Sequence, residues 1–292
     1  MNPLPKISVI TPSYNQASFL EQTILSVLGQ GYKNLEYIIM DGGSTDNSAE
    51  VIKRYERQLA YWVSEKDSGQ SDAINKGFAR ATGDILCWLN SDDFFLPGIL
   101  HEVAKNFENF DGFIYGDCIS FSDTGVRCLV NRPPAYDREL LGILDYIVQP
   151  STFWARTLWE KTGILNQNLH YAFDWDWFLR ASEFGDLRKC NTIFSAYRFH
   201  DAHKSASGGE KRMEEIISVA SMRGGERAAR HYQFAKDNLA TLRKHEHLAR
   251  RIKGRGISNY LEKARWAFPS LWQLPTGIDF NKVRTCAGML GW

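Results

Sequence analysis

The sequence contains no apolar run near the roughly 20 residues that span a bilayer. Its first residues, MNPLPK, lack the apolar stretch of a secretory signal peptide. Its five cysteines form neither a C-x-x-C pair nor a His-paired spacing, so we expect reduced thiols rather than a zinc site or a disulfide framework. With 43% hydrophobic and 24% charged residues among 292, and no repeats, we expect a globular cytoplasmic protein.

Net charge is also almost absent, since the formal total is +1 at pH 7. The charges are nevertheless divided unevenly along the chain. Residues 1–203 carry 18 Lys and Arg against 26 Asp and Glu, a net −8, whereas residues 204–292 carry 17 against 8, a net +9. The sequence therefore predicts an acidic body followed by a basic region that faces an anionic partner.

The basic region ends in an amphipathic segment that mixes cationic and aromatic side chains. Such a segment is typical of a helix on an anionic membrane surface, so we expect peripheral binding at the inner face of the cell membrane, with a solvated helix face as the alternative. We expect no nucleic-acid partner, because no nucleic-acid-binding module is present. The residues concerned are Arg250, Arg251, Lys253, Arg255, Lys263, Arg265, Trp266, Phe268, Leu271 and Trp272.

The first hundred residues alternate short apolar runs with helical periodicity, a pattern typical of a parallel sheet covered by helices. A break of small residues at 205–209 separates a main domain, 1–207, with halves at 1–110 and 111–207, from a helical extension, 208–292. Ser18 and Glu21 predict a capping box at the first helix. Strands are predicted at 7–11, 35–40, 59–64, 84–89, 112–121 and 126–130, and helices at 19–30, 48–56, 70–80, 138–144, 156–162, 174–184 and 211–253.

Three predicted strands end in polar residues: Thr11-Pro-Ser-Tyr-Asn15, Asp41 and Asn90-Ser-Asp-Asp93. Open α/β sheets bind ligands at the carboxyl ends of their strands, so one nucleotide-sized site is expected there. The adjacent carboxylates of Asp92 and Asp93 repel each other, and a divalent cation such as Mg²⁺ or Mn²⁺, completed by a diphosphate, is their natural partner. A helix-capping role is the alternative.

The order and spacing of three segments resemble those of a known family. The segments are ISVITPSYNQASFLEQTILSVLGQ, YIIMDGGSTDNSAEVI and DSGQSDAINKGFARATGDILCWLNSDD. They resemble family 2 glycosyltransferases with the GT-A fold, most of all the branch that builds bacterial surface polysaccharides such as O-antigen. The resemblance covers about residues 6–203. It implies an α/β fold in which helices flank a mixed sheet with a Rossmann-like nucleotide-binding half, followed here by the C-terminal helical extension.

The resemblance also implies which residues bind the nucleotide-sugar. Thr11, Pro12 and Tyr14, with Asn15 in the same loop, would lie against the base, and Tyr14 is available for stacking. Asp41 would accept a hydrogen bond from the base, which favours uracil and hence a UDP-sugar, although an Asx-turn is the alternative.

Gly69, Asp72 and Asn75 would pass beside the nucleotide, with a helix cap as the alternative for Asp72. Asn90 stands where many members have the first Asp of a D-x-D motif. Asp92 and Asp93 are then the remaining carboxylates, one for the ribose and at least one for the metal.

The acceptor side is implied by two further segments. In many relatives a Glu-Asp pair opens a helix and its Asp deprotonates the acceptor hydroxyl. Here Phe173 replaces the Glu, and Asp174 aligns with the catalytic Asp, with a helix cap as the alternative. Trp175, Asp176 and Gln149 would lie on the acceptor side, with core packing as the alternative for Trp175.

The segment Tyr197–Ser205 resembles the Tyr, Arg and His pattern that follows in the family. His200 would be a further ligand of the metal or the diphosphate, ahead of His203, and Arg198 or Lys204 would neutralise phosphate charge.

Taken together, the motifs predict an inverting, metal-dependent glycosyltransferase that moves a sugar from a nucleotide-diphosphate donor to a glycan or lipid-linked acceptor. A metal-dependent nucleotidyltransferase is an alternative, but it would show a Gly-rich loop with a basic residue near the first strand, and no basic residue follows that strand before Lys33. The other alternative is a non-catalytic scaffold that binds nucleotide-sugars.

Overall fold

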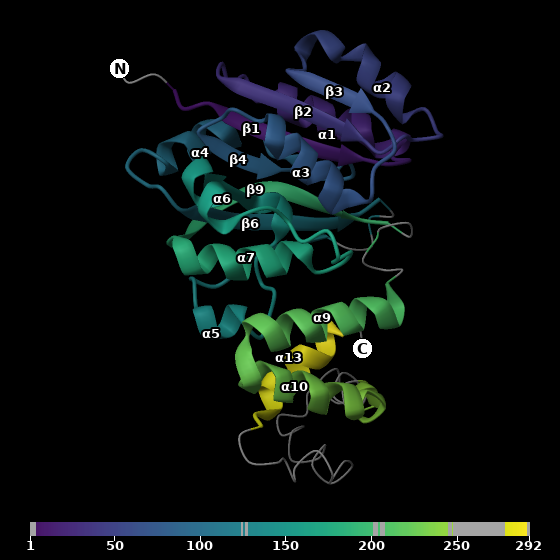
Figure 1. Ribbon diagram of the computed structural model, residues 1–292, viewed down its shortest axis with the longest axis vertical. Helices are drawn as coiled ribbons and strands as arrows, with labels where there is room; N and C mark the ends of the chain where they lie inside the picture. The colour runs from purple at the N-terminus through teal and green to yellow at the C-terminus, as the bar shows by residue number, and fades with distance from the viewer. Residues whose placement is uncertain are drawn as a thin grey trace. The chain divides into compact units, whose positions relative to one another are not determined.

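The computed structural model describes residues 4–123, 125, 128–200, 204, 208–244, 247 and 278–290. The chain forms two compact units (Figure 1). One comprises Met1–Asp137 with Tyr146–Ala206, and the other Arg138–Asp145 with Ser207–Trp292. Residues 138–145, placed in the first domain by the sequence pattern, thus group with the C-terminal unit. The predicted membrane-binding segment at 250–272 lies outside the described residues, and so does His203.

Within the described residues the first unit contains one nine-stranded mixed sheet, in the order β3-β2-β1-β4-β8-β6-β9-β5 with β7 paired to β6. Its first four strands run parallel, and β8 pairs antiparallel with both β4 and β6. The bounds are β1 Ile7–Ser13, β2 Leu35–Asp41, β3 Tyr61–Ser64, β4 Ile85–Trp88, β5 Phe94–Phe95, β6 Phe113–Ser122, β7 Cys128–Asn131, β8 Thr152–Ala155 and β9 Leu187–Phe199.

The predicted helices of the first unit are confirmed to within a few residues, whereas α4, β5, β8 and β9 were not predicted. The capping box is wrong: the first helix begins at Ala17 without a side-chain cap, and the Glu21 carboxylate accepts from the Tyr55 hydroxyl at 2.7 Å. The bounds are α1 Ala17–Leu28, α2 Ser48–Arg54, η1 Glu56–Gln58, α3 Gln70–Arg80, α4 Ile99–Asn106, η2 Gln149–Ser151, α6 Arg156–Thr162 and α7 Phe173–Phe184.

Strand β1 is buried along its whole length because both faces of the sheet are covered. Ile7 and Val9 pack in one apolar cluster with residues of α1, α2 and α4. On the other face, α3 lies so close that a Cβ added to Gly77 would be 2.4 Å from Cγ2 of Ile10. This close contact fixes α3, and with it the loop before α3, against the carboxyl ends of the strands.

The second unit is helical, with α5 Arg138–Leu141, α9 Gly209–Arg223, α10 Gly225–Asp237 and α13 Phe280–Met289. The helical range predicted at 211–253 is divided by a turn between α9 and α10, where Gly225 has a φ of +77° that favours glycine. The Tyr232 hydroxyl donates to the main-chain oxygen of Ile143 at 2.7 Å, so α10 is tied to the segment after α5. No helix in the described ranges combines the length and the apolarity that crossing a membrane requires.

Candidate active site

The loops after β1, β2 and β4 meet at one edge of the sheet, because these strands are parallel neighbours in register. Asn15 joins two of them: its N–H donates to Ser44 Oγ at 2.8 Å, and its side-chain oxygen accepts from the Thr45 N–H at 2.8 Å. Its φ of 53° lies in the left-handed region, which Asn tolerates better than most residues. Asn15 therefore shapes the loop with its own side chain.

The residues that are expected to lie against the base differ in how far their side chains are exposed to solvent. Tyr14 is 60% exposed and available for stacking. Thr11 and Pro12 are buried, and the Thr11 hydroxyl lies 3.1 Å from the Tyr37 hydroxyl. The Thr11 side chain is thus turned into the protein, and a position of Thr11 against the base stays a prediction.

Asp41 is 2% exposed, and its carboxylate accepts three hydrogen bonds. Ser44 donates from its N–H at 2.9 Å and its hydroxyl at 2.5 Å, and Ser64 donates from its hydroxyl at 2.6 Å. About four lone-pair positions exist on a carboxylate, so little capacity is left for a base. The turn at Asp41 is present, and its base-reading role stays a prediction.

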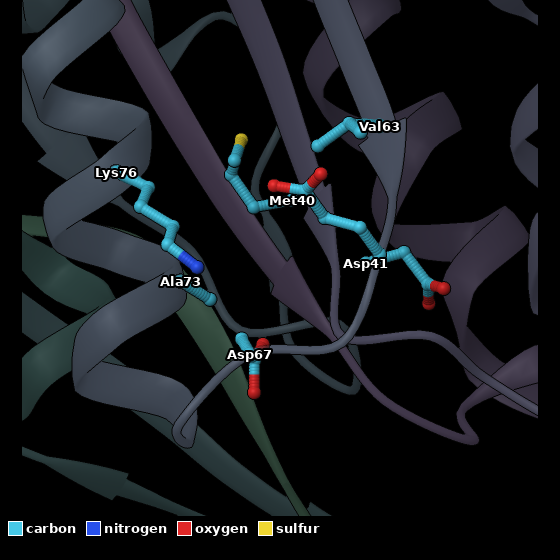
Figure 2. A pocket seen from close by; sticks show the side chains of 7 residues that line it. Met40, Asp41, Val63, Asp67, Ala73 and Lys76 are labelled. Atoms are coloured by element: carbon cyan, nitrogen blue, oxygen red, sulfur yellow. The ribbon is translucent and has the colours of Figure 1, made fainter.

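A small pocket, with room for about one water molecule, opens beside Asp41. Figure 2 shows Lys76 reaching from α3 toward the middle of the group, with Asp67 on the loop before α3. A Cβ on Gly42 would lie 2.6 Å from Asp67 Oδ2, so Gly42 makes room for this carboxylate. Burial, with the charges of Asp72 and Asp41, raises the pKa of Asp67. The pocket is lined by Met40, Asp41, Val63, Glu65, Asp67, Ala73 and Lys76.

Asp67 and Lys76 were not singled out from the sequence. The signal available was the DSG segment, in which Gly69 has a φ of +117° and must be glycine to begin α3. The Gly69 N–H donates to Asp67 Oδ1 at 2.8 Å and thereby orients this carboxylate at the pocket.

Asp72 and Asn75, expected beside the nucleotide, serve the fold instead. Asp72 accepts from the Ser68 N–H at 3.0 Å and pairs with Lys76 at 2.9 Å. Burial opposes ionisation of Asp72, but these hydrogen bonds outweigh it and lower the pKa. The Asn75 amide exchanges two hydrogen bonds of 2.9 Å with the main chain of Leu165, so it binds a loop rather than a ligand.

Asp92 and His200 form a close side-chain pair at this edge. His200 Nε2 lies 3.0 Å from Asp92 Oδ2, and both side chains retain some exposure, 10% and 20%. Two adjacent ligands of an octahedral cation, each at about 2.1 Å, lie roughly 3.0 Å apart, so the pair fits such an ion. Within the described residues no group of three or more His, Cys, Asp or Glu side chains is placed to hold a metal ion.

Asp93 is separated from this pair by its burial, with an exposure of 1%. Its Oδ1 accepts from the Arg198 N–H at 3.0 Å, and its buried Oδ2 has no hydrogen-bond partner among the described residues. Burial and the charge of Asp92 raise the pKa of Asp93 well above its usual range. The Asp93 carboxylate attaches the loop to β9 through Oδ1, and metal binding by Asp93 stays a prediction.

The Arg198 guanidinium, expected on phosphate, is also buried and used within the protein. Its Nε donates to the main-chain oxygen of Asp92 at 3.1 Å, and its terminal nitrogens donate to Asp123 and Gln22. The phosphate-binding role predicted for Arg198 is wrong for this structure. Asn90 and Gln149 likewise bond to each other, at 3.2 Å.

Comparison with known proteins identifies the family. The model of glycosyl transferase family 2 matches residues 8–173. An uncharacterised glycosyltransferase of Mycobacterium tuberculosis is 31% identical over 80% of this chain and 96% of its own. The chain belongs to glycosyl transferase family 2. A second uncharacterised glycosyltransferase, from Nostoc, is 27% identical over 91% of this chain and 86% of its own.

Solved structures show that this family 2 member has the GT-A fold. The mannosyltransferase PcManGT of Pyrobaculum calidifontis, in complex with GDP-Man and Mn²⁺, gives a TM-score of 0.63 at 16% identity, over 99% of this chain and 86% of that one. S. aureus TarS 1–349, in complex with UDP-GlcNAc, gives 0.61 at 17% identity, over 73% of this chain and 64% of that one.

Of the residues expected to contact the acceptor of this family 2 glycosyltransferase, Asp174, Trp175 and Asp176 lie on α7 and Gln149 lies on η2. Asp174 is half-buried in its first turn, where Oδ1 lies 2.8 Å from the Trp175 N–H. Trp175 and Asp176 are buried, and the Asp176 carboxylate accepts from Arg180 Nε at 2.9 Å. The expectation that Trp175 and Asp176 face an acceptor is wrong here, because one packs in the core and the other is an internal ion pair.

Proposed function

We propose that this glycosyltransferase is a metal-dependent, inverting enzyme that uses a nucleotide-diphosphate sugar, with a UDP-sugar favoured. The observation that carries the proposal is the Asp92–His200 pair at the end of β4, 3.0 Å apart at the edge where the strand-end loops meet. The complexes of TarS with UDP-GlcNAc and of PcManGT with GDP-Man and Mn²⁺ support it.

Asp92 and His200 would hold Mn²⁺ or Mg²⁺ together with the donor diphosphate. The bound cation supplies charge compensation for the diphosphate leaving group. The Phe19 ring lies 4.6 Å from the His200 ring between centroids and keeps the imidazole oriented toward Asp92.

The base would bind at the strand ends beside Asp41, against the residues that line the small pocket. Uracil presents an N–H next to a carbonyl oxygen, and the pocket lining offers an acceptor in Asp67 and a donor in Lys76. Tyr14 would stack on the exposed face of the base.

Asp174 would act as the base that removes the acceptor hydroxyl proton while that oxygen attacks the anomeric carbon from the face opposite the diphosphate. One displacement inverts the anomeric centre. We propose a glycan or lipid-linked acceptor of bacterial surface-polysaccharide synthesis, and peripheral membrane binding through the basic segment at 250–272.

A donor screen tests this function. Purified protein is incubated with UDP-, GDP- and dTDP-sugars, with Mn²⁺, Mg²⁺ or EDTA, and release of the nucleotide is measured. We expect release from a UDP-sugar that depends on the metal. Equal release in EDTA would contradict metal dependence, and release from none of the donors would contradict the proposed activity.

A further inference from the structure

Polar side chains form an unbroken line beside the 90–93 loop. Lys204 Nζ donates to Gln70 Oε1 at 3.0 Å, and Gln70 Nε2 donates to Asn90 Oδ1 at 2.8 Å. Asn90 Nδ2 donates to Gln149 Oε1 at 3.2 Å, and Gln149 Nε2 donates to the main-chain oxygen of Trp88 at 2.9 Å. We call this line, from Lys204 through the three amides to Trp88, the amide chain.

All hydrogen bonds of the amide chain run in one direction, because its two ends permit no other. The Lys204 ammonium can only donate, and the Trp88 carbonyl can only accept. Each amide must therefore turn its oxygen toward Lys204 and its NH₂ group toward Trp88. The middle position needs a side chain that accepts from Gln70 and donates to Gln149.

We propose that Asn90 is a positioning residue of the donor site, and that an aspartate cannot take its place. A carboxylate at this position would accept a hydrogen bond from Gln70 Nε2. Its other oxygen, however, would face Gln149 Oε1, so that two acceptors would meet without a hydrogen between them. Gln149 cannot rotate to compensate, since its oxygen would then face the Trp88 carbonyl. The Asn90 amide also faces the Asp93 carboxyl, so a new carboxylate would stand against Asp93 as well.

This inference explains a departure from the family. The first Asp of the D-x-D motif is Asn90 in this chain. Its amide is committed to the chain, which sets the start of the loop that presents Asp92. The expected effect of Asn90 on cation binding by Asp92 rests on the proposed function. The direction of the hydrogen bonds in the amide chain does not depend on that function.

Asn90→Asp, Gln149→Lys and the double variant test the inference, at about pH 8, far above the ordinary carboxyl pKa of about 4. Melting temperature and the affinity for UDP in the presence of Mn²⁺ are measured for each. Asn191→Asp, on the exposed side of β9, is the control for added negative charge. In the double variant the new ammonium group can donate both to the new carboxylate and to the Trp88 oxygen.

We expect Asn90→Asp to lower the melting temperature by roughly 3–6 °C, the effect of leaving one buried acceptor unpaired, and to weaken Mn²⁺-dependent UDP binding about tenfold. Gln149→Lys alone is expected to be similarly destabilised. The double variant is expected to recover most of the loss in melting temperature and most of the loss in UDP affinity. The control Asn191→Asp is expected to match the unsubstituted protein. Stronger Mn²⁺-dependent binding by Asn90→Asp would overturn the proposal and mark Asn90 as a lost metal ligand.

The proposal would also be overturned if the double variant lost as much melting temperature and UDP affinity as the two single variants together. If Asn90→Asp does not fold, Gln70→Glu breaks the chain at its half-buried outer link, and an unchanged melting temperature in that variant would refute the chain. Absence of Mn²⁺-dependent UDP binding in the unsubstituted protein would contradict the proposed function, and the melting temperatures would still decide the inference.

Discussion

Arg198 is expected to be the residue whose loss most directly displaces the Asp92–His200 pair while both of these side chains stay in place. Its guanidinium lies between the Phe19 and Phe121 rings, at 4.9 and 4.8 Å from their centroids. Its Nε holds the Asp92 main chain, so Arg198→Ala would leave that oxygen without its charged donor.

The magnitude follows from these contacts. A hydrogen bond from a charged donor contributes about 1.5–3 kcal/mol, and each ring contact about 0.5–1 kcal/mol. The pair with Asp123 adds little, because that carboxylate is 49% exposed. We expect Arg198→Ala to lose about 3–4 kcal/mol of unfolding free energy, or roughly 6–12 °C in melting temperature.

The assay is thermal unfolding, followed by calorimetric titration of UDP with Mn²⁺ well below the melting temperature. Arg198→Lys keeps the charge but loses the forked donors, and it should recover less than half of the stability. Arg188→Ala is the matched control, since Arg188 is an exposed arginine stacked on Phe110 at 3.9 Å. Equal losses for Arg198→Ala and Arg188→Ala, or unchanged UDP affinity in Arg198→Ala, would refute this reasoning.

Three further predictions concern other residues. Burial raises the pKa of Glu36, but hydrogen bonds from Lys6, Ser8 and Thr82 outweigh it and lower the pKa to about 2. The stability from this carboxylate is therefore present above the ordinary value of 4.5 and lost as pH falls toward 2. The free energy of unfolding, measured in urea, should fall by up to about 3 kcal/mol through this group as the pH is lowered. Glu36→Gln should remove this pH dependence, and a pH profile that the substitution leaves unaltered would exclude the contribution of Glu36. Asp174→Asn should abolish transfer and leave UDP affinity within about twofold, and retained transfer would remove Asp174 from the base role. Asp67→Asn should weaken UDP binding about tenfold and narrow the difference between UDP and CDP, as measured by titration; an unchanged ratio would exclude base reading by Asp67.

The sequence predicted the nucleotide-binding half well because its signals are local. Apolar runs ending in polar loops gave the strands through β4, and periodicity gave α3 with its observed bounds. The second half was harder, since β9 is a 13-residue strand, LRKCNTIFSAYRF, in which polar and apolar residues do not alternate regularly. Strand β9 pairs with both β6 and β5, and these pairings join residues that are far apart in the sequence.

At the site, the sequence located the right segments but not which side chains face a ligand. Asp92 and Asp93 are indistinguishable as letters, and the structure separates them because Arg198 binds one and His200 meets the other. Asp72, Asn75 and Asp176 were expected at ligands, yet each one satisfies a main-chain or side-chain group of the fold. Such pairings require knowledge of the tertiary neighbours, which one sequence does not contain.

The central claim is that Asp92 and His200 together hold the cation of the donor complex. Titration of UDP into the unsubstituted protein, Asp92→Asn and His200→Ala, each with Mn²⁺ and with EDTA, tests it most directly. We predict that Mn²⁺ strengthens UDP binding at least about tenfold in the unsubstituted protein and has no effect in either variant. A Mn²⁺ effect that survives in both variants but disappears in Asp93→Asn would contradict the account.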